Sequence, residues 1–207
     1  MCFGLIMAAT DWYRNKRWNE EIEATFFTKL NRARSQKDQY LVIQALTLVK
    51  CHPEVSLRLV DYYFEIRKDD FEDMRALLAR AEAYLELDKI SEAMAAYRAV
   101  LAREEEFPKH QSSTYVDYPY IVATRGIESE YENALNVLEQ YVNRLTFPID
   151  HFKWHAAKAL IGNDGVSASK ALEAAEVKRS GFRFHQNVGL VGKEHADTIK
   201  KLCRVST

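Results

Sequence analysis

The chain is poor in the residues that form turns and in those that cross-link small folds. Its 207 residues include only seven glycines and four prolines, too few for the many tight turns of a β-rich fold. The three cysteines, Cys2, Cys51 and Cys203, are odd in number and share no short spacing, which argues against a disulfide framework and a zinc motif. We therefore expect a helical protein of the reducing cytoplasm.

Long apolar runs and a surplus of one charge are also missing. No segment approaches about twenty consecutive apolar residues, and no basic residue precedes the apolar opening at residues 1–9, so neither a membrane span nor a signal peptide is expected. The net charge is −1. Because phosphate contacts need a surplus of Lys and Arg, we expect no general nucleic-acid binding.

The charges are nevertheless distributed unevenly along the chain. Residues 54–106 carry eight basic and fourteen acidic groups, whereas residues 151–207 carry ten basic and five acidic groups. The middle is therefore acidic and the end basic. This asymmetry either steers a charged partner or reflects only the solvated faces of helices.

Signatures of catalysis are missing as well. The sequence has no glycine-rich loop followed by Lys-Ser or Lys-Thr and no Gly-x-Ser-x-Gly elbow, which are the usual marks of phosphate binding and of a serine nucleophile. Cys51 and His52 are adjacent, an arrangement unsuited to a nucleophile and its base. We expect no enzyme activity and no cofactor.

His151 and His155 lie four residues apart on an expected helix, a spacing that suits two metal ligands. The glutamate of the metalloprotease motif is missing between them, and no third ligand is close in sequence. We therefore predict no metal site. A helical enzyme that uses both histidines and a carboxylate is the least favoured reading.

Apolar residues recur with the helical period from Trp18 onward. The expected helices break at Pro53, at Asp88–Ser91, at Phe147–Pro148 and at Asn163–Gly165, where turn-forming residues stand. Ser112 or Ser113 is expected to cap the next helix, although Pro119 disfavours helical geometry at Tyr118, so that this helix begins or kinks there. The rhythm is lost after residue 181, and a short final helix is expected at about 193–203.

One segment follows a known repeat pattern. Leu77, Ala81 and Tyr84 in one expected helix are followed by Ala93 and Tyr97 in the next, with a proline at 108. Small residues at this spacing let two helices approach closely, while the aromatic residues fill the flanking space. The segment resembles the tetratricopeptide (TPR) repeat. The equivalent small positions, Ala45, Ala81, Val122 and Ala156, are 36, 41 and 34 residues apart, with an insertion near 109–114.

The resemblance implies an all-α fold of stacked antiparallel helix pairs, a right-handed TPR-like α-solenoid of nine to ten helices. The expected organisation is an N-terminal extension at 1–18, a repeat domain at 19–180 and a C-terminal tail at 181–207 that packs as a cap or into the groove. The whole chain is similar to uncharacterised bacterial TPR-like proteins. The features that carry this likeness are Trp12–Arg14 with Trp18, Phe147–Asp150, and Ser180–His185 with Val188–Val191, and they imply no particular activity.

By resemblance, the first helix of each pair lines a concave groove that accepts a protein or peptide. The groove positions would be Arg75, Leu78, Glu82 and Leu85 in the second pair and Asp150, Lys153, Ala157 and Leu160 in the last. Chaperone-binding members of the family grip a terminal carboxylate with lysines and asparagines. The matching places hold Val42, Leu46, Leu78 and Glu82 here, so we expect no chaperone tail as ligand.

Three further residues are candidates for contact with a partner. Tyr118 belongs to a tyrosine-rich stretch that suits either a recognition surface or ordinary packing. Arg183 and His185 flank Phe184 in the tail, where they would bind an anion or neutralise a helix end.

Two readings of function follow from this pattern. The first is a non-enzymatic interaction scaffold that uses its groove. The second is a regulatory or assembly subunit whose groove is filled by Phe182–Val191 and which binds through its outer surface. The end of a repeat stack must be covered, and a homodimer through Phe3, Leu5, Ile6 and Trp12 would cover it.

Overall fold

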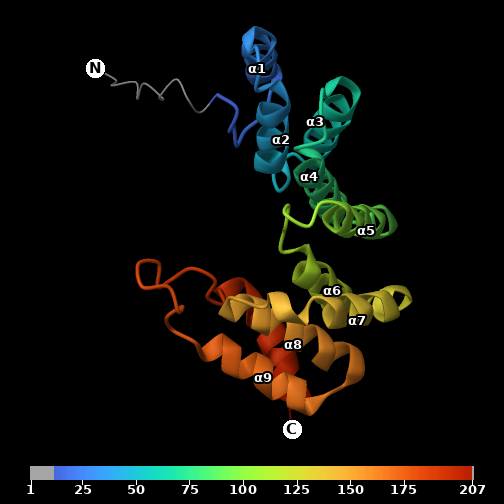
Figure 1. The fold of residues 1–207 in the computed structure, drawn as a ribbon, viewed down its shortest axis with the longest axis vertical. Coiled ribbons are helices and arrows are strands. Elements are labelled where there is room, and N and C mark those ends of the chain that lie inside the picture. Colours follow the sequence, from blue (N-terminus) through green and yellow to red (C-terminus); the bar gives the residue numbers. More distant parts are fainter. Residues whose placement is uncertain (1–11, 207) are drawn as a thin grey trace. The chain divides into compact units, whose positions relative to one another are not determined.

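The computed structural model describes residues 12–206, and within them every regular element is a helix (Figure 1). Cys2, Phe3, Leu5 and Ile6 lie outside the described residues. The chain divides into two compact units, Met1–Gln111 and Ser112–Thr207, which we call unit 1 and unit 2. The boundary falls in the insertion expected at 109–114. None of the helices in residues 12–206 combines the length and the apolar character needed to cross a membrane.

Unit 1 contains five α-helices within its described part. They are α1 (Glu20–Arg32), α2 (Lys37–Leu48), α3 (Pro53–Ile66), α4 (Asp73–Glu86) and α5 (Ile90–Glu106). Local signals set several of these ends. The side chain of Asn19 accepts a hydrogen bond from the amide of Ile22 at the start of α1, and α3 begins at Pro53, whose missing N–H is not needed there.

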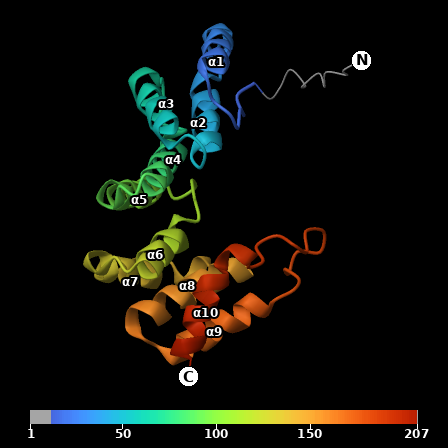
Figure 2. The same cartoon turned by 180° about the vertical axis from the view of Figure 1, so that it is seen from behind.

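Successive helices of unit 1 pack against one another, α2 on α3, α3 on α4 and α4 on α5, and α2 also contacts α4 (Figure 2). Ala81 of α4 and Ala93 of α5 are both fully buried, and Tyr97 is almost so. The small residues therefore lie inside the unit, as the close-packing argument requires. Trp12 is not free at the surface, because its ring packs against Phe26 at 5.5 Å and Tyr40 at 4.9 Å.

Unit 2 also contains five α-helices within its described part. They are α6 (Thr114–Arg125), α7 (Tyr131–Gln140), α8 (Pro148–Gly162), α9 (Gly165–Glu176) and α10 (Ala196–Val205), with short 3-10 turns at Glu128–Glu130, Val142–Arg144 and Lys193–His195. Helix α6 packs on α7 and α8, and α8 packs on α9. The turn between α8 and α9 uses Asn163 in the left-handed conformation and Asp164 as the cap of α9.

Helix α6 begins four residues before Tyr118 and continues through Pro119, so the expected start of this helix at Tyr118 is wrong. Side chains at its first turn explain the earlier start. The Ser112 hydroxyl oxygen accepts from the amide of Thr114, and the Ser113 hydroxyl donates to the Asp117 carboxylate. These contacts stabilise the first turn before the chain reaches Pro119, whose preceding residue is only biased against helix.

Helix α10 lies against α8 and α9. Its Leu202 is fully buried among four alanines of those helices, Ala156, Ala159, Ala168 and Ala171. The hydroxyl of Tyr120 from α6 lies 2.8 Å from Nδ1 of His195 and 2.7 Å from the Thr198 hydroxyl oxygen. The C-terminal helix is thus a core element of unit 2, held there by the burial of Leu202 and by partly buried polar contacts.

Candidate functional site

A groove runs over the surface of unit 2 between α8 and α9, and the segment after α9 contributes to its wall. Its volume is about 600 Å³, in the range of about 300–1,000 Å³ typical of ligand pockets. We call it the α8–α9 groove. The residues that line it are Thr146, Pro148, His151, His155, Lys170, Glu173, Ala174, Val177, Arg179 and Gly181.

Helical spacing explains why these side chains share the groove. Pro148, His151 and His155 are at positions i, i+3 and i+7 of α8, which lie on one face of a helix. On α9 and just beyond it, the residues at positions 170, 173, 174 and 177 follow the same rule. Two facing helical stripes therefore form the walls.

The charges of the groove are mainly positive. Lys170 and Arg179 are both exposed, and neither forms an ion pair with any residue in the described part of the chain. Glu173 is the one carboxylate among the lining residues. A ligand that carries negative charge would thus meet two cations whose charge is not already neutralised.

His155 contributes a neutral imidazole to this wall. Burial lowers its pKa to about 4, and the nearby positive charge of Lys170 acts in the same direction. Its Nδ1 atom is buried and has no hydrogen-bond partner. Within residues 12–206, no three His, Cys, Asp or Glu side chains are grouped so as to hold a metal ion. His151 and His155 instead line the α8–α9 groove with two amphipathic imidazole rings.

This lowered pKa predicts a specific loss of stability in acid. An unfolded chain takes up a proton on His155 near pH 6.5, whereas the folded chain resists it until about pH 4. Between these values the unfolded state binds more protons, so folding stability falls as the pH decreases. With an allowance for partial exposure, we expect His155 to account for about 1–2 kcal/mol of that loss.

The measurement is urea unfolding at pH 7.5 and pH 4.5 for the native chain and for His155→Gln. The variant should show the smaller loss between the two pH values. The matched control is His185→Gln, the same substitution at an exposed histidine of the tail. Equal losses in His155→Gln and the native chain would contradict this assignment.

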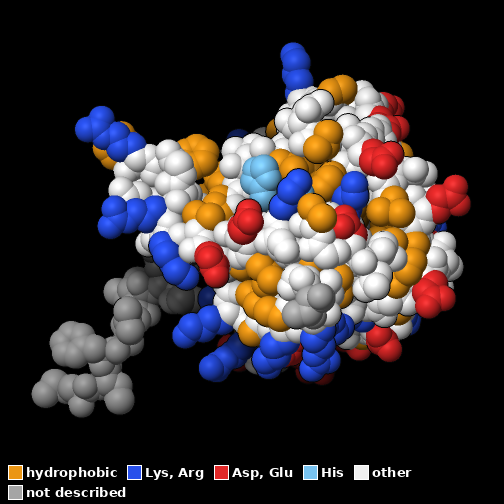
Figure 3. Space-filling view, turned by 90° about the horizontal axis from the view of Figure 1, so that it is seen from below, with side chains coloured by type: hydrophobic (Ala, Val, Ile, Leu, Met, Phe, Trp, Pro, Cys, Tyr) orange, Lys and Arg blue, Asp and Glu red, His pale blue; other side chains and the backbone are white. Residues whose placement is uncertain are grey.

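One end of the groove continues into an exposed apolar loop. Phe182 stacks on Phe147 with 5.2 Å between ring centroids, and Phe182, Phe184 and Val188 are 44%, 83% and 47% exposed. Figure 3 shows the same kind of surface on the face seen from below, where hydrophobic side chains lie between charged ones. Grouped exposed apolar side chains of this kind are typical of contact surfaces.

The loop holds a defined shape through its backbone. The Ser180 hydroxyl donates to the carbonyl of His185, and the amide of Ile149 donates to the carbonyl of Gly189 at 2.8 Å. Gly189 has a φ of +71°, and a Cβ there would approach Phe147 to 2.4 Å. The close approach to Phe147 therefore requires glycine and fixes the loop beside the start of α8.

The partner-binding residues predicted from sequence are divided between unit 1 and unit 2. In unit 1, Arg75, Leu78 and Glu82 are partly exposed on α4, and Arg75 forms an ion pair with Glu72 at 2.8 Å. In unit 2, Arg183 and His185 are exposed in the loop that adjoins the α8–α9 groove. Only this second pair lies near the groove.

The other predicted residues of unit 2 are used in packing. Tyr118 is fully buried and its hydroxyl donates to Glu130 at 2.7 Å, so its side chain belongs to the core and not to a binding surface. Lys153 forms an ion pair with Asp117 of α6, and Leu160 packs between two core clusters. These positions of α8 are occupied by their contacts inside unit 2.

Sequence reasoning missed Lys170, Glu173, Val177 and Arg179 as site residues. The signal that pointed toward them was the basic excess of residues 151–207, but that excess does not say which cations lie in the same groove.

The chain matches no protein-family model, no curated protein and no solved structure. Its described residues form an all-α protein whose helices pack against one another within each unit.

Proposed function

We propose that this chain is a non-enzymatic protein-interaction scaffold, related to TPR proteins, that binds an acidic and partly apolar peptide segment in the α8–α9 groove. The observation that carries the proposal is the pair of exposed cations, Lys170 and Arg179, without ion-pair partners in a groove of about 600 Å³. A carboxylate of a partner would neutralise them at little desolvation cost, because both remain near water.

The apolar loop supports a polypeptide over a small ion as the ligand. Phe182 and Phe184 extend the contact surface beyond the groove, and aromatic side chains supply much of the binding energy in protein interfaces. A segment that combines Asp or Glu with aliphatic or aromatic residues would use both features. A small anion would use the cations alone.

The alternative is a regulatory or assembly subunit whose groove is filled by its own tail. That reading needs Phe182–Val191 to be buried. The exposure of Phe182, Phe184 and Val188 favours the open site, while the burial of Leu202 supports a structural role for the last helix of the tail.

The test is fluorescence anisotropy with two labelled peptide pools of equal apolar content, one rich in Glu and Asp and one rich in Lys. We expect the acidic pool alone to bind with a Kd of about 100 μM or lower. The double variant Lys170→Glu/Arg179→Glu should weaken binding by about tenfold or more, because two attractions become repulsions.

The matched control is Lys193→Glu/Lys200→Glu, which makes the same change of net charge at two exposed lysines outside the groove. It should retain the affinity of the native chain. Equal binding of both pools, or equal weakening by both double variants, would show that the interaction is not a property of this groove.

A further inference from the structure

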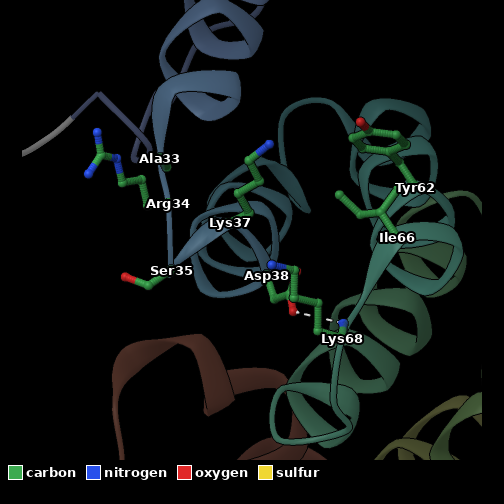
Figure 4. A pocket seen from close by; sticks show the side chains of 8 residues that line it. All are labelled: Ala33, Arg34, Ser35, Lys37, Asp38, Tyr62, Ile66 and Lys68. Atoms are coloured by element: carbon green, nitrogen blue, oxygen red, sulfur yellow. Dashed lines mark hydrogen bonds between the residues drawn. The ribbon is translucent and has the colours of Figure 1, made fainter.

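A second, smaller pocket lies in unit 1, between the start of α2 and the end of α3 (Figure 4). Its volume is about 340 Å³, which is near the lower limit of about 300 Å³ for ligand pockets. It is lined by the α1–α2 connection, the first turn of α2, the end of α3 and the residue Lys68 after it. All of its lining residues belong to unit 1.

Three of the residues that line this pocket are cationic, and they come from three places in the chain. Arg34 comes from the α1–α2 connection, Lys37 from α2 and Lys68 from the segment after α3. None of the three forms an ion pair with a residue in the described range 12–206. In Figure 4, Lys37 extends upward from α2, Lys68 lies beside Asp38 below it, and Arg34 is directed away from the pocket.

The single carboxylate of the lining is partly satisfied by the backbone. Asp38 accepts a hydrogen bond from the amide of Lys68 at 3.2 Å, which fixes the end of α3 next to α2. Three cations against one carboxylate leave the pocket positive. An anion with several acceptor oxygens is the ligand that such a group of donors favours.

The opposite wall has a different character. Tyr62 packs edge-on against Phe27 at 5.8 Å, and Ile66 packs against the core of unit 1. The Tyr62 hydroxyl makes no hydrogen bond with any residue that the structure describes. This wall therefore offers an aromatic and aliphatic surface together with one hydroxyl donor.

We propose that this pocket binds a small phosphate monoester, with the phosphate held by Lys37 and Lys68 of its lining and the apolar ester group against Tyr62 and Ile66. The pocket size fits a small molecule better than an extended chain. The ammonium groups of the two lysines and the Tyr62 hydroxyl would donate hydrogen bonds to the phosphate oxygens. The ester group would cover the apolar wall.

The experiment uses isothermal titration calorimetry on the full chain with phenyl phosphate, inorganic phosphate and benzyl alcohol as separate probes. We expect saturable binding of phenyl phosphate, at least threefold weaker binding of inorganic phosphate and no binding of benzyl alcohol, since both walls must be used. Equal affinity for inorganic phosphate and phenyl phosphate would overturn the assignment of the apolar wall. No saturable binding of phenyl phosphate up to about 10 mM would overturn the site as a whole.

Variants locate the binding. Lys37→Gln/Lys68→Gln should weaken phenyl phosphate binding by about tenfold or more, and Tyr62→Phe by about threefold. The matched control, Lys29→Gln/Lys50→Gln, removes two exposed lysines of the same unit that do not line the pocket, and it should bind like the native chain. An unchanged affinity in Lys37→Gln/Lys68→Gln, with a native circular dichroism spectrum, would place the phosphate elsewhere.

A last arm distinguishes a small molecule from a phosphorylated polypeptide. A phosphoserine pentapeptide should bind more weakly than phenyl phosphate, because its backbone has no place in a pocket of about 340 Å³. Tighter binding of the peptide would overturn the small-ester proposal in favour of a phosphorylated partner.

Discussion

Replacement of Phe152 by alanine is expected to lower the free energy of unfolding by about 3–5 kcal/mol. The ring is fully buried and joins three elements of unit 2, with Tyr120 of α6 at 6.0 Å and His195, next to α10, at 5.2 Å between ring centroids. Much of the surrounding cluster is already alanine. Small neighbours cannot extend into the space, so a cavity remains.

The measurement is urea unfolding of the native chain and of Phe152→Ala followed by circular dichroism. The matched control is Phe184→Ala, which deletes the same side chain at a position that is 83% exposed. That control should change stability by less than about 0.5 kcal/mol. If both variants lost similar amounts, the cluster around Phe152 would not be the core of unit 2.

Replacement of Asp73 by alanine is expected to cost about 2–4 kcal/mol of stability in unit 1. The fully buried Tyr63 donates its hydroxyl hydrogen to Oδ1 of Asp73 at 2.7 Å, and Arg67 forms an ion pair with the same carboxylate. Burial, with the Asp73 carboxylate next to it, raises the pKa of Tyr63. The phenol therefore stays protonated and needs an acceptor, which the variant removes.

A double-mutant cycle separates this contact from general damage. Tyr63→Phe should be costly in the native chain and nearly neutral in Asp73→Ala, because the hydroxyl has already lost its acceptor. Asp69→Ala, at an exposed carboxylate nearby, is the control for charge and should cost less than about 1 kcal/mol. Additive effects of Tyr63→Phe and Asp73→Ala would contradict the proposed coupling.

Most helices were predictable because their limits are local. Asn19 and Pro53 mark helix starts through hydrogen bonding and fixed backbone geometry, and the turn at Asn163–Gly165 ends α8 where expected. These signals act within one turn of the chain and need no tertiary contact. The final helix was expected at about 193–203 and begins at Ala196 after a 3-10 turn.

Pro119 shows where a local signal fails. The bias of proline against helix in the preceding residue is a preference, and burial of Val116, Tyr118 and Val122 in unit 2 overrides it. The tyrosine-rich stretch that suggests a recognition role for Tyr118 is likewise a local signal. The density of tyrosines in its stretch gives no information about which rings are covered by other helices.

The candidate sites could be predicted only in part. The periodicity identified the apolar and polar faces of α8, but not that α6 would cover Lys153 and Leu160. The sequence shows the basic excess near the end of the chain. Whether Lys170 and Arg179 line the same groove, however, depends on the path of the chain after α9.

The sequence by itself determined the all-α class, the turns and the small residues that allow close helix packing, because these depend on intrinsic propensity and on spacing along one helix. Only the tertiary structure decided which polar faces remain open. The pocket of unit 1 brings together residues from the α1–α2 connection, α2 and α3, and the α8–α9 groove combines two helices with the segment that follows them. Which residues line one pocket depends on long-range packing, and the pattern of residues along the chain does not indicate it.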